Sequence, residues 1–146
     1  MLKETYGSEE TYRLGEEMGR KAEPGDVYAL TGDLGTGKTV FAQGFAAGLG
    51  ISGYVNSPTF TILQVYEEGR LPLYHFDVYR IEEPEEMEEI GYEDYFYGDG
   101  VTLIEWAELI DVLLPDRAFR INISKDPGKG DDYRRIEMLP GNEVSH

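Results

Sequence analysis

Residues 32–39 are the part of the chain whose residue types and spacing point most directly to chemistry. They read Gly-Asp-Leu-Gly-Thr-Gly-Lys-Thr and fit G-x-x-x-x-G-K-S/T, the pattern of a phosphate-binding loop (P-loop). In such a loop the glycines let backbone N–H groups surround phosphate oxygens. Lys38 would reach the β- and γ-phosphates, and the Thr39 hydroxyl would bind Mg²⁺. A β-prone run at 27–31 precedes the loop and a helical pattern at 40–47 follows it, so the stretch predicts a nucleotide phosphate site.

A P-loop protein also needs an acidic group for Mg²⁺ at the end of a neighbouring apolar strand. Glu105 is the candidate, because it directly follows the apolar run 101–104, which is typical of a buried central strand. The alternative is a surface glutamate at a strand end. Trp106, the only tryptophan, either forms a wall of the site or is an ordinary packing residue.

Two further positions are candidates for hydrolysis. In the predicted strand 71–79, His75 and Asp77 lie on one face, and Asp77 is a candidate for orienting the attacking water, directly or through His75. The alternative for Asp77 is a surface acid on a hairpin strand. Thr59 lies in a loop after the P-loop helix, where other P-loop proteins place a hydroxyl that senses Mg²⁺ and the γ-phosphate.

The remaining pattern predicts the elements that position these residues. Ser8 is a candidate N-cap for a helix that extends to about residue 22, which either covers the sheet or lies near the adenine. Residues 82–94 are rich in glutamate, and we interpret them as a solvated helix face in preference to a docking surface. The other expected elements are a strand over 60–66 with a hairpin turn at 67–70, a short helix over 109–114, strands over 119–123 and 133–138, a loop over 126–132 and a frayed tail of eight residues.

Length and charge limit the possible functions. The 146 residues predict one domain with a real core, and the absence of cysteine excludes disulfides and thiolate metal sites. No apolar run is long enough for a membrane span and no secretory signal is visible, so we expect a cytoplasmic protein with no membrane contact. Against 29 acidic residues there are 13 lysines and arginines, a net charge of −16, so the chain should repel nucleic acids at long range.

Four motifs together resemble the bacterial TsaE family, the small P-loop ATPase of tRNA threonylcarbamoyladenosine biosynthesis. They are the P-loop at 32–39, Ser-Pro-Thr-Phe-Thr at 57–61, His-Phe-Asp-Val-Tyr-Arg at 75–80 and Ile-Glu-Trp at 104–106. The resemblance covers about residues 5–125, and the set of four is far more specific than any one motif.

The resemblance implies an α/β, three-layer P-loop NTPase-like fold with a mixed parallel and antiparallel central sheet. It implies ATP hydrolysis, Mg²⁺ held by Thr39 and Glu105, a role for Asp77 in hydrolysis and a switch-like loop at Thr59. The nucleotide-binding residues that it implies are Ser8, Thr11, Gly35, Thr36, Gly37, Lys38, Thr39, Val40 and Gly130.

The family ATPase does not make the threonylcarbamoyl bond. It supports the transferase subunit and that subunit's dimerisation partner, which modify tRNAs that read codons beginning with A; this implies contact with tRNA only through those partners. Two positions depart from the family pattern: Val40 stands where many members have a second threonine, and Ala107 where a proline is common. The first departure removes one possible α-phosphate contact.

Three rival functions remain to be weighed. A GTPase needs N-K-x-D, and residues 122–126 have those letters at the wrong spacing. A nucleoside or small-molecule kinase needs an arginine-bearing lid over the transferred phosphate, but the eight arginines are scattered and no lid-like insertion is present. A nucleotide-gated interaction module, in which hydrolysis is incidental, remains open.

Overall fold

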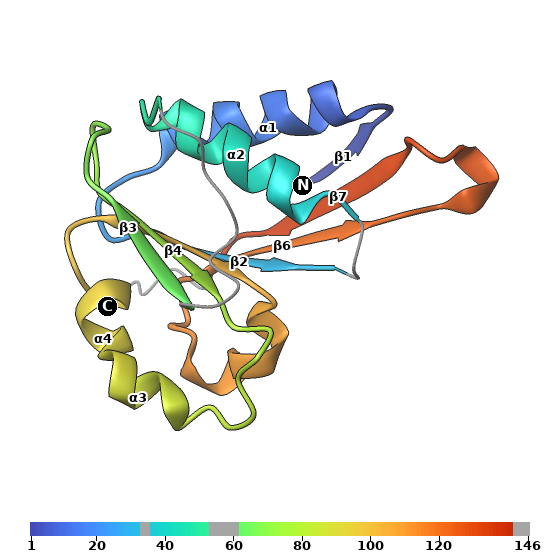
Figure 1. The fold of residues 1–146 in the computed structure, drawn as a ribbon. Helices are drawn as coiled ribbons and strands as arrows, with labels where there is room; N and C mark the ends of the chain where they lie inside the picture. Colours follow the sequence, from blue (N-terminus) through green and yellow to red (C-terminus); the bar gives the residue numbers. More distant parts are fainter. Residues whose placement is uncertain (33–35, 53–61, 142–146) are drawn as a thin grey trace.

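A mixed β-sheet forms the middle layer of the molecule (Figure 1). The structure, a computed structural model, describes residues 1–32, 36–52 and 62–141. Within these residues seven strands follow the order β1-β7-β6-β2-β5-β4-β3, with β4, β5, β2 and β6 parallel and β1, β7 and β3 antiparallel to their neighbours. The strands are β1 (Leu2–Thr5), β2 (Val27–Thr31), β3 (Leu63–Tyr66), β4 (Leu73–Asp77), β5 (Val101–Glu105), β6 (Phe119–Ser124) and β7 (Arg134–Leu139).

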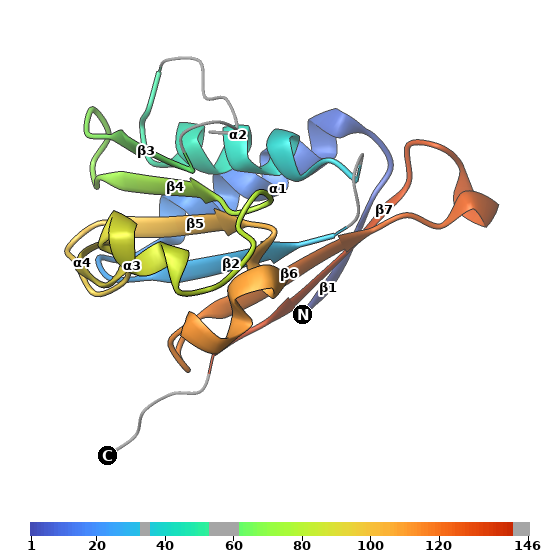
Figure 2. The same cartoon turned by 60° about the horizontal axis from the view of Figure 1, so that its bottom comes forward.

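Helices cover both faces of this sheet, which confirms the predicted three-layer α/β architecture. Helices α1 (Ser8–Lys21) and α2 (Lys38–Gly48) lie together on one face, and α3 (Glu86–Ile90) and α4 (Tyr92–Phe96) lie on the other (Figure 1). The 3₁₀ helix η1 (Ala107–Leu113) also lies on the second face, and η2 (Pro127–Lys129) is at the tip of the β6–β7 hairpin, which projects from the sheet (Figure 2). No helix of the described residues is long and apolar enough to cross a bilayer.

The central strands alternate their side chains between two cores. In β5 every residue is buried, and Val101 and Leu103 join the core under α1 and α2 whereas Ile104 joins the core under α3 and α4. Side chains alternate between the two cores because successive residues of a pleated strand point to opposite faces. The residues of β5 are nearly all apolar because both faces of the strand are buried.

Glycines allow α1 and α2 to pack with their backbones in close approach. A Cβ on Gly44 of α2 would overlap with the carbonyl oxygen of Tyr12, and one on Gly15 of α1 would overlap with that of Phe41. Gly19 of α1 and Gly48 of α2 make equivalent close approaches further along the two helices, and we call this line of four glycines the α1–α2 seam. The seam therefore fixes where α2 begins relative to the sheet.

Several element boundaries differ from the sequence prediction. Ser8 is not the N-cap of α1: Gly7 is, and no side-chain cap hydrogen bond is present there. The strand β1 was not predicted, because its residues are mostly exposed and show no alternation of apolar and polar side chains. It forms by pairing with β7. The acidic stretch forms two short helices, since Gly91 with a φ of 76° ends α3 and begins α4.

Two C-terminal expectations also change. The predicted helix over 109–114 is a 3₁₀ helix that starts earlier, at Ala107. The predicted frayed tail begins inside β7, because Leu139 still pairs with Arg120 of β6. The first two residues of the strand predicted over 60–66 lie outside the described residues, as do residues 142–146.

The α1–α2 seam gives the first testable prediction. Gly44→Ala should lower the free energy of unfolding by about 3 kcal/mol, because the new methyl group meets backbone atoms that cannot rotate away. Urea unfolding followed by circular dichroism measures the change. The control is Gly7→Ser, which adds a Cβ in open space at the N-cap of α1 and should cost nothing. Equal stability of Gly44→Ala and the parent chain would contradict the close approach of the two helix backbones at Gly44.

Candidate functional site

The carboxyl ends of β2, β5 and β4 bring the candidate catalytic residues to one edge of the sheet. In the parallel pairing, Glu105 at the end of β5 lies opposite Leu30 of β2 on one side and opposite Asp77 of β4 on the other. The P-loop leaves β2 just after this point. Ligands of open α/β sheets bind outside the carboxyl ends of the strands, so this edge is the candidate site.

Side-chain alternation places the acids on the α2 face of the sheet. Leu73 of β4 and Leu103 of β5 both belong to the core under α1 and α2. His75, Asp77 and Glu105 follow these leucines at steps of two residues, so they point to the same face. All three residues are buried, with 1%, 6% and 2% of the residue surface exposed. The alternative that Asp77 and Glu105 are surface acids is therefore wrong.

The start of α2 has the geometry of an anion site. Gly37 is its N-cap, with a φ of 98° in the left-handed region, and a Cβ there would meet nothing, so the backbone angle is what favours glycine. The helix begins at Lys38, two residues earlier than the sequence predicted, so Lys38, Thr39 and Val40 form its first turn. The N–H groups of a first turn lack partners inside the helix and carry the positive end of its dipole.

Lys38 lies inside the candidate site rather than on the protein surface. Its side chain is buried, and its Nζ donates a hydrogen bond to the carbonyl oxygen of Gly32. The same Nζ lies 3.3 Å from the centroid of the Trp106 ring, which is a cation–π contact. Trp106 reaches this position through a left-handed backbone conformation, with a φ of 62°, directly after Glu105. The indole thus forms a surface next to the P-loop lysine.

The two acids have different partners. Glu105 Oε2 lies 2.7 Å from His75 Nε2, and both side chains are almost completely buried. Asp77 Oδ1 accepts a hydrogen bond of 3.0 Å from the backbone N–H of Tyr79. The sequence had suggested that His75 acts with Asp77, whereas the structure joins His75 to Glu105.

Two of the residues that the resemblance placed near the nucleotide, Thr36 and Thr11, are linked to each other through β7 and β1. Arg134 Nε donates to the carbonyl oxygen of Thr36 in the P-loop, and Arg134 is paired in register with Thr5 of β1. Thr5 Oγ1 lies 2.8 Å from Thr11 Oγ1 of α1, so Thr11 is connected to the P-loop through Thr5 and Arg134. Arg134 was missed by sequence reasoning because no local pattern marks it.

Ser8 and Gly130 are less closely tied to the P-loop. Ser8 is exposed on the first turn of α1, one turn before Thr11. Gly130, with a φ of 108°, ends η2 in the exposed tip of the β6–β7 hairpin.

An ionic contact ties the hairpin to β1. Tyr133 Oη donates to Glu4 Oε2 at 2.7 Å, and Lys129 Nζ lies 3.3 Å from the same oxygen. These two contacts, the hydrogen bond from Tyr133 first, lower the pKa of the Glu4 carboxyl. The hairpin is thereby joined to β1.

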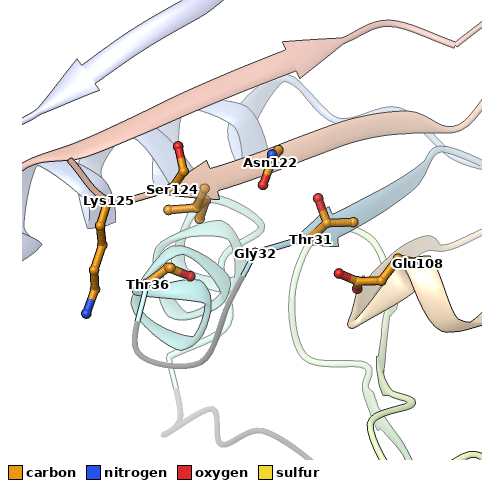
Figure 3. A pocket seen from close by; sticks show the side chains of 8 residues that line it. Thr31, Gly32, Thr36, Glu108, Asn122, Ser124 and Lys125 are labelled. Atoms are coloured by element: carbon orange, nitrogen blue, oxygen red, sulfur yellow. The ribbon is translucent and has the colours of Figure 1, made fainter.

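A polar cavity of about 630 Å³ borders the P-loop. Thr31 of β2 and Asn122 of β6 point into it, and Glu108 of η1 lies across from them (Figure 3). The other lining residues are Gly32, Thr36, Ile123, Ser124 and Lys125. Apart from Gly32 and Thr36 of the P-loop, sequence reasoning did not single out these residues as site residues, because the cavity forms only when β2 and β6 pair. Its volume is within the range of small-molecule sites.

Two predicted site residues cannot be placed. Gly35 of the P-loop and Thr59 of the proposed switch-like loop lie outside the described residues.

The residues that are described fit a phosphate group with Mg²⁺. Thr39, Asp77 and Glu105 offer only oxygen ligands, which Mg²⁺ prefers, at the same edge as the first turn of α2. The described residues contain no group of three His, Cys, Asp or Glu side chains that could hold a metal ion by themselves.

The fold and the site define a three-layer α/β protein of the P-loop NTPase-like class, with a mixed sheet and a P-loop sequence between β2 and α2. The family model described as threonylcarbamoyl adenosine biosynthesis protein TsaE matches residues 5–136. The chain belongs to the TsaE family, which confirms the resemblance seen in its motifs.

Similar proteins cover most of the chain. It is 52% identical over 132 residues to the tRNA threonylcarbamoyladenosine biosynthesis protein TsaE of Bacillus subtilis, covering 90% of this chain and 80% of that protein. The TsaE protein of Treponema pallidum is 46% identical, with 80% of this chain and 85% of that protein covered. The crystal structure of Bacillus subtilis YdiB superposes with a TM-score of 0.83 at 43% identity, over 97% of this chain and 86% of that one.

Proposed function

We propose that this protein binds and hydrolyses Mg-ATP, and that its hydrolysis supports the enzyme complex that makes threonylcarbamoyladenosine in tRNA. Membership of the TsaE family gives the pathway. One observation carries the ATPase proposal. Glu105 lies in register with Leu30 of the strand that enters the P-loop and with Asp77 on its other side, and Lys38 is the first residue of α2.

Each residue has a role that follows from its position. The first-turn N–H groups of α2 and the Lys38 ammonium bind phosphate oxygens, which neutralises their charge locally despite the acidic chain. Thr39 and Glu105 hold Mg²⁺, which, when bound, withdraws charge from the β- and γ-phosphate oxygens. The Trp106 ring covers the lysine and limits the access of water to it.

Asp77 orients the attacking water. The water oxygen bonds to the γ-phosphorus while the bond to the β–γ bridging oxygen breaks, which gives ADP and inorganic phosphate. The water proton passes to the Asp77 carboxylate and then to solvent, so the carboxylate is restored in each turnover. The hydrogen bond from Tyr79 N–H fixes one oxygen of this carboxylate.

The partners in this proposal are the threonylcarbamoyl transferase subunit and its dimerisation partner. Hydrolysis by the isolated chain is slow and is stimulated by these partners. A small-molecule kinase would instead transfer the phosphate to an acceptor in the absence of any protein partner.

Loss of the P-loop lysine tests the proposed function directly. Lys38→Ala should lower ATP hydrolysis by about 10²-fold or more, because it removes the cation that faces the transferred phosphate. Phosphate release measures turnover and calorimetry measures nucleotide affinity. The control is Lys21→Ala, an exposed lysine paired with Glu17, which should leave both unchanged. Turnover close to that of the parent in folded Lys38→Ala protein would overturn the proposal.

Asp77→Asn tests the chemical step. Asparagine keeps the shape and the acceptor for Tyr79 N–H but removes the charge, so ATP affinity should hold while turnover falls by roughly 10²–10⁴. Single-turnover hydrolysis at saturating ATP gives the rate, and calorimetry gives the affinity. Weakened affinity with full turnover would make Asp77 a binding residue instead.

The net charge of the protein predicts whether it binds tRNA without a partner. The isolated chain should bind tRNA negligibly at physiological salt, because 29 acids outnumber 13 bases. A local basic patch of Arg117, Arg120, Arg134 and Arg135 would be needed to override the net charge, but these arginines are already engaged with carbonyl oxygens or acidic side chains.

Fluorescence anisotropy with labelled tRNA measures this binding, first for the protein alone and then with the partner subunits. Binding that appears only with the partners is expected. Micromolar, salt-sensitive affinity of the protein alone would contradict the prediction.

A further inference from the structure

His75 makes an unusual contact for a residue without an assigned role. Its Nε2 lies 2.7 Å from Glu105 Oε2, and the two side chains are 1% and 3% exposed. By contrast, the other ion pairs among the described residues join side chains that are 35% to 75% exposed. The contact joins β4 to β5 two residues before the end of β4.

The partners of the imidazole define its tautomer. A carboxylate accepts hydrogen bonds, so Nε2 carries the hydrogen that it donates to Glu105. Nδ1 is then the unprotonated ring nitrogen, and it is buried without a hydrogen-bond partner among the residues that the structure describes. The ring is therefore anchored through its bond to Glu105.

Packing alone does not account for this pair. Leu73 and Leu103 fill the preceding positions on the same face of the same two strands. Burying a histidine and a glutamate there removes both from water, and apolar residues of similar size commonly stabilise a core at least as well. The pair therefore points to a requirement of the site rather than of the fold.

We propose that His75 is a positioning residue for Glu105, holding one carboxylate oxygen through Nε2–H so that the other is presented to the divalent ion of the bound nucleotide. This inference rests on the proposed function, in which Glu105 binds Mg²⁺. Glutamate has three rotatable side-chain bonds, and fixing Oε2 selects one orientation before the metal arrives. Outer partners that orient metal ligands in this way commonly change metal affinity by 10–100-fold.

Three variants separate positioning from packing. His75→Ala removes the donor and should weaken the Mg²⁺-dependent gain in ADP affinity by about 10–100-fold, while ADP affinity in EDTA stays unchanged. His75→Gln places an amide N–H close to the position of Nε2 and should restore most of the gain. His75→Asn is the matched control, because its shorter amide reaches only the position of Nδ1 and should behave like alanine.

Calorimetric titration of ADP, with EDTA and then with increasing Mg²⁺, measures these affinities without any turnover. A full Mg²⁺-dependent gain in folded His75→Ala would overturn the inference, as would equal loss of affinity with and without Mg²⁺. Failure of His75→Gln to exceed His75→Asn would also overturn it.

An NMR measurement on proteins that keep His75 covers the case in which the His75 variants do not fold. Nitrogen-15 NMR of the two histidine rings should show one ring, His75, in the Nε2–H tautomer, and Glu105→Gln should alter its signals. An Nδ1–H tautomer would overturn the inference. Failure of the proposed function gives a different result: the parent protein itself would show no Mg²⁺-dependent gain in ADP affinity.

Discussion

The parallel pairing of β5 with β2 and β4 is the constraint on which the rest of the site depends. It sets Glu105 beside Leu30 at the mouth of the P-loop and beside Asp77 at the end of β4. A shift of one residue in β5 would turn Glu105 to the opposite face, among the apolar residues under α3 and α4. The complete burial of β5 opposes such a shift, because the shift would also exchange every side chain between the two cores. The hydrophobic pattern thus fixes the geometry of the polar site.

The helical layer supplies the other half of the geometry. The first turn of helix α2, which starts at Lys38, must lie at the edge of the sheet. The close packing of the α2 glycines against the backbone of α1 holds the helix in that position. Arg70 strengthens this arrangement, because its Nη2 donates to the carbonyl oxygens of Gly19, Arg20 and Ala22 at the end of α1. An arginine of the β3–β4 turn therefore satisfies carbonyls that the helix leaves open. The position of the phosphate-binding turn depends on packing far from it.

The sequence predicted the features that a local pattern encodes. The P-loop, the buried strand before Glu105 and the alternation that groups His75 with Asp77 all follow from spacing or periodicity within one segment, and the mixed sheet followed from family resemblance. The edge strand β1 was missed because its residues form a strand only when β7 is beside them. The pairing of His75 with Glu105 was missed for a related reason, since it depends on the register between strands about thirty residues apart. The burial of Lys38 does not follow from its own segment either, because the residue that covers it, Trp106, comes from the end of β5.

Charge is distributed unevenly between the two outer layers, and this bears on how an acidic protein can hold a nucleotide. Between Arg80 and Arg117 the sequence contains no lysine or arginine, and this segment forms α3, α4 and η1 on the second face of the sheet. The phosphate-binding turn of α2 lies on the first face, so the sheet separates the acids of α3 and α4 from it, whereas Glu105 and Glu108 of the same segment lie at the site. Coulomb repulsion between surface charges falls steeply beyond about 8 Å at physiological ionic strength, whereas Lys38 and the α2 amides act at contact distance. Local donors therefore outweigh the net charge for a small nucleotide, but they cannot do so for a polyanion that spans the whole surface, which needs cations supplied by another protein.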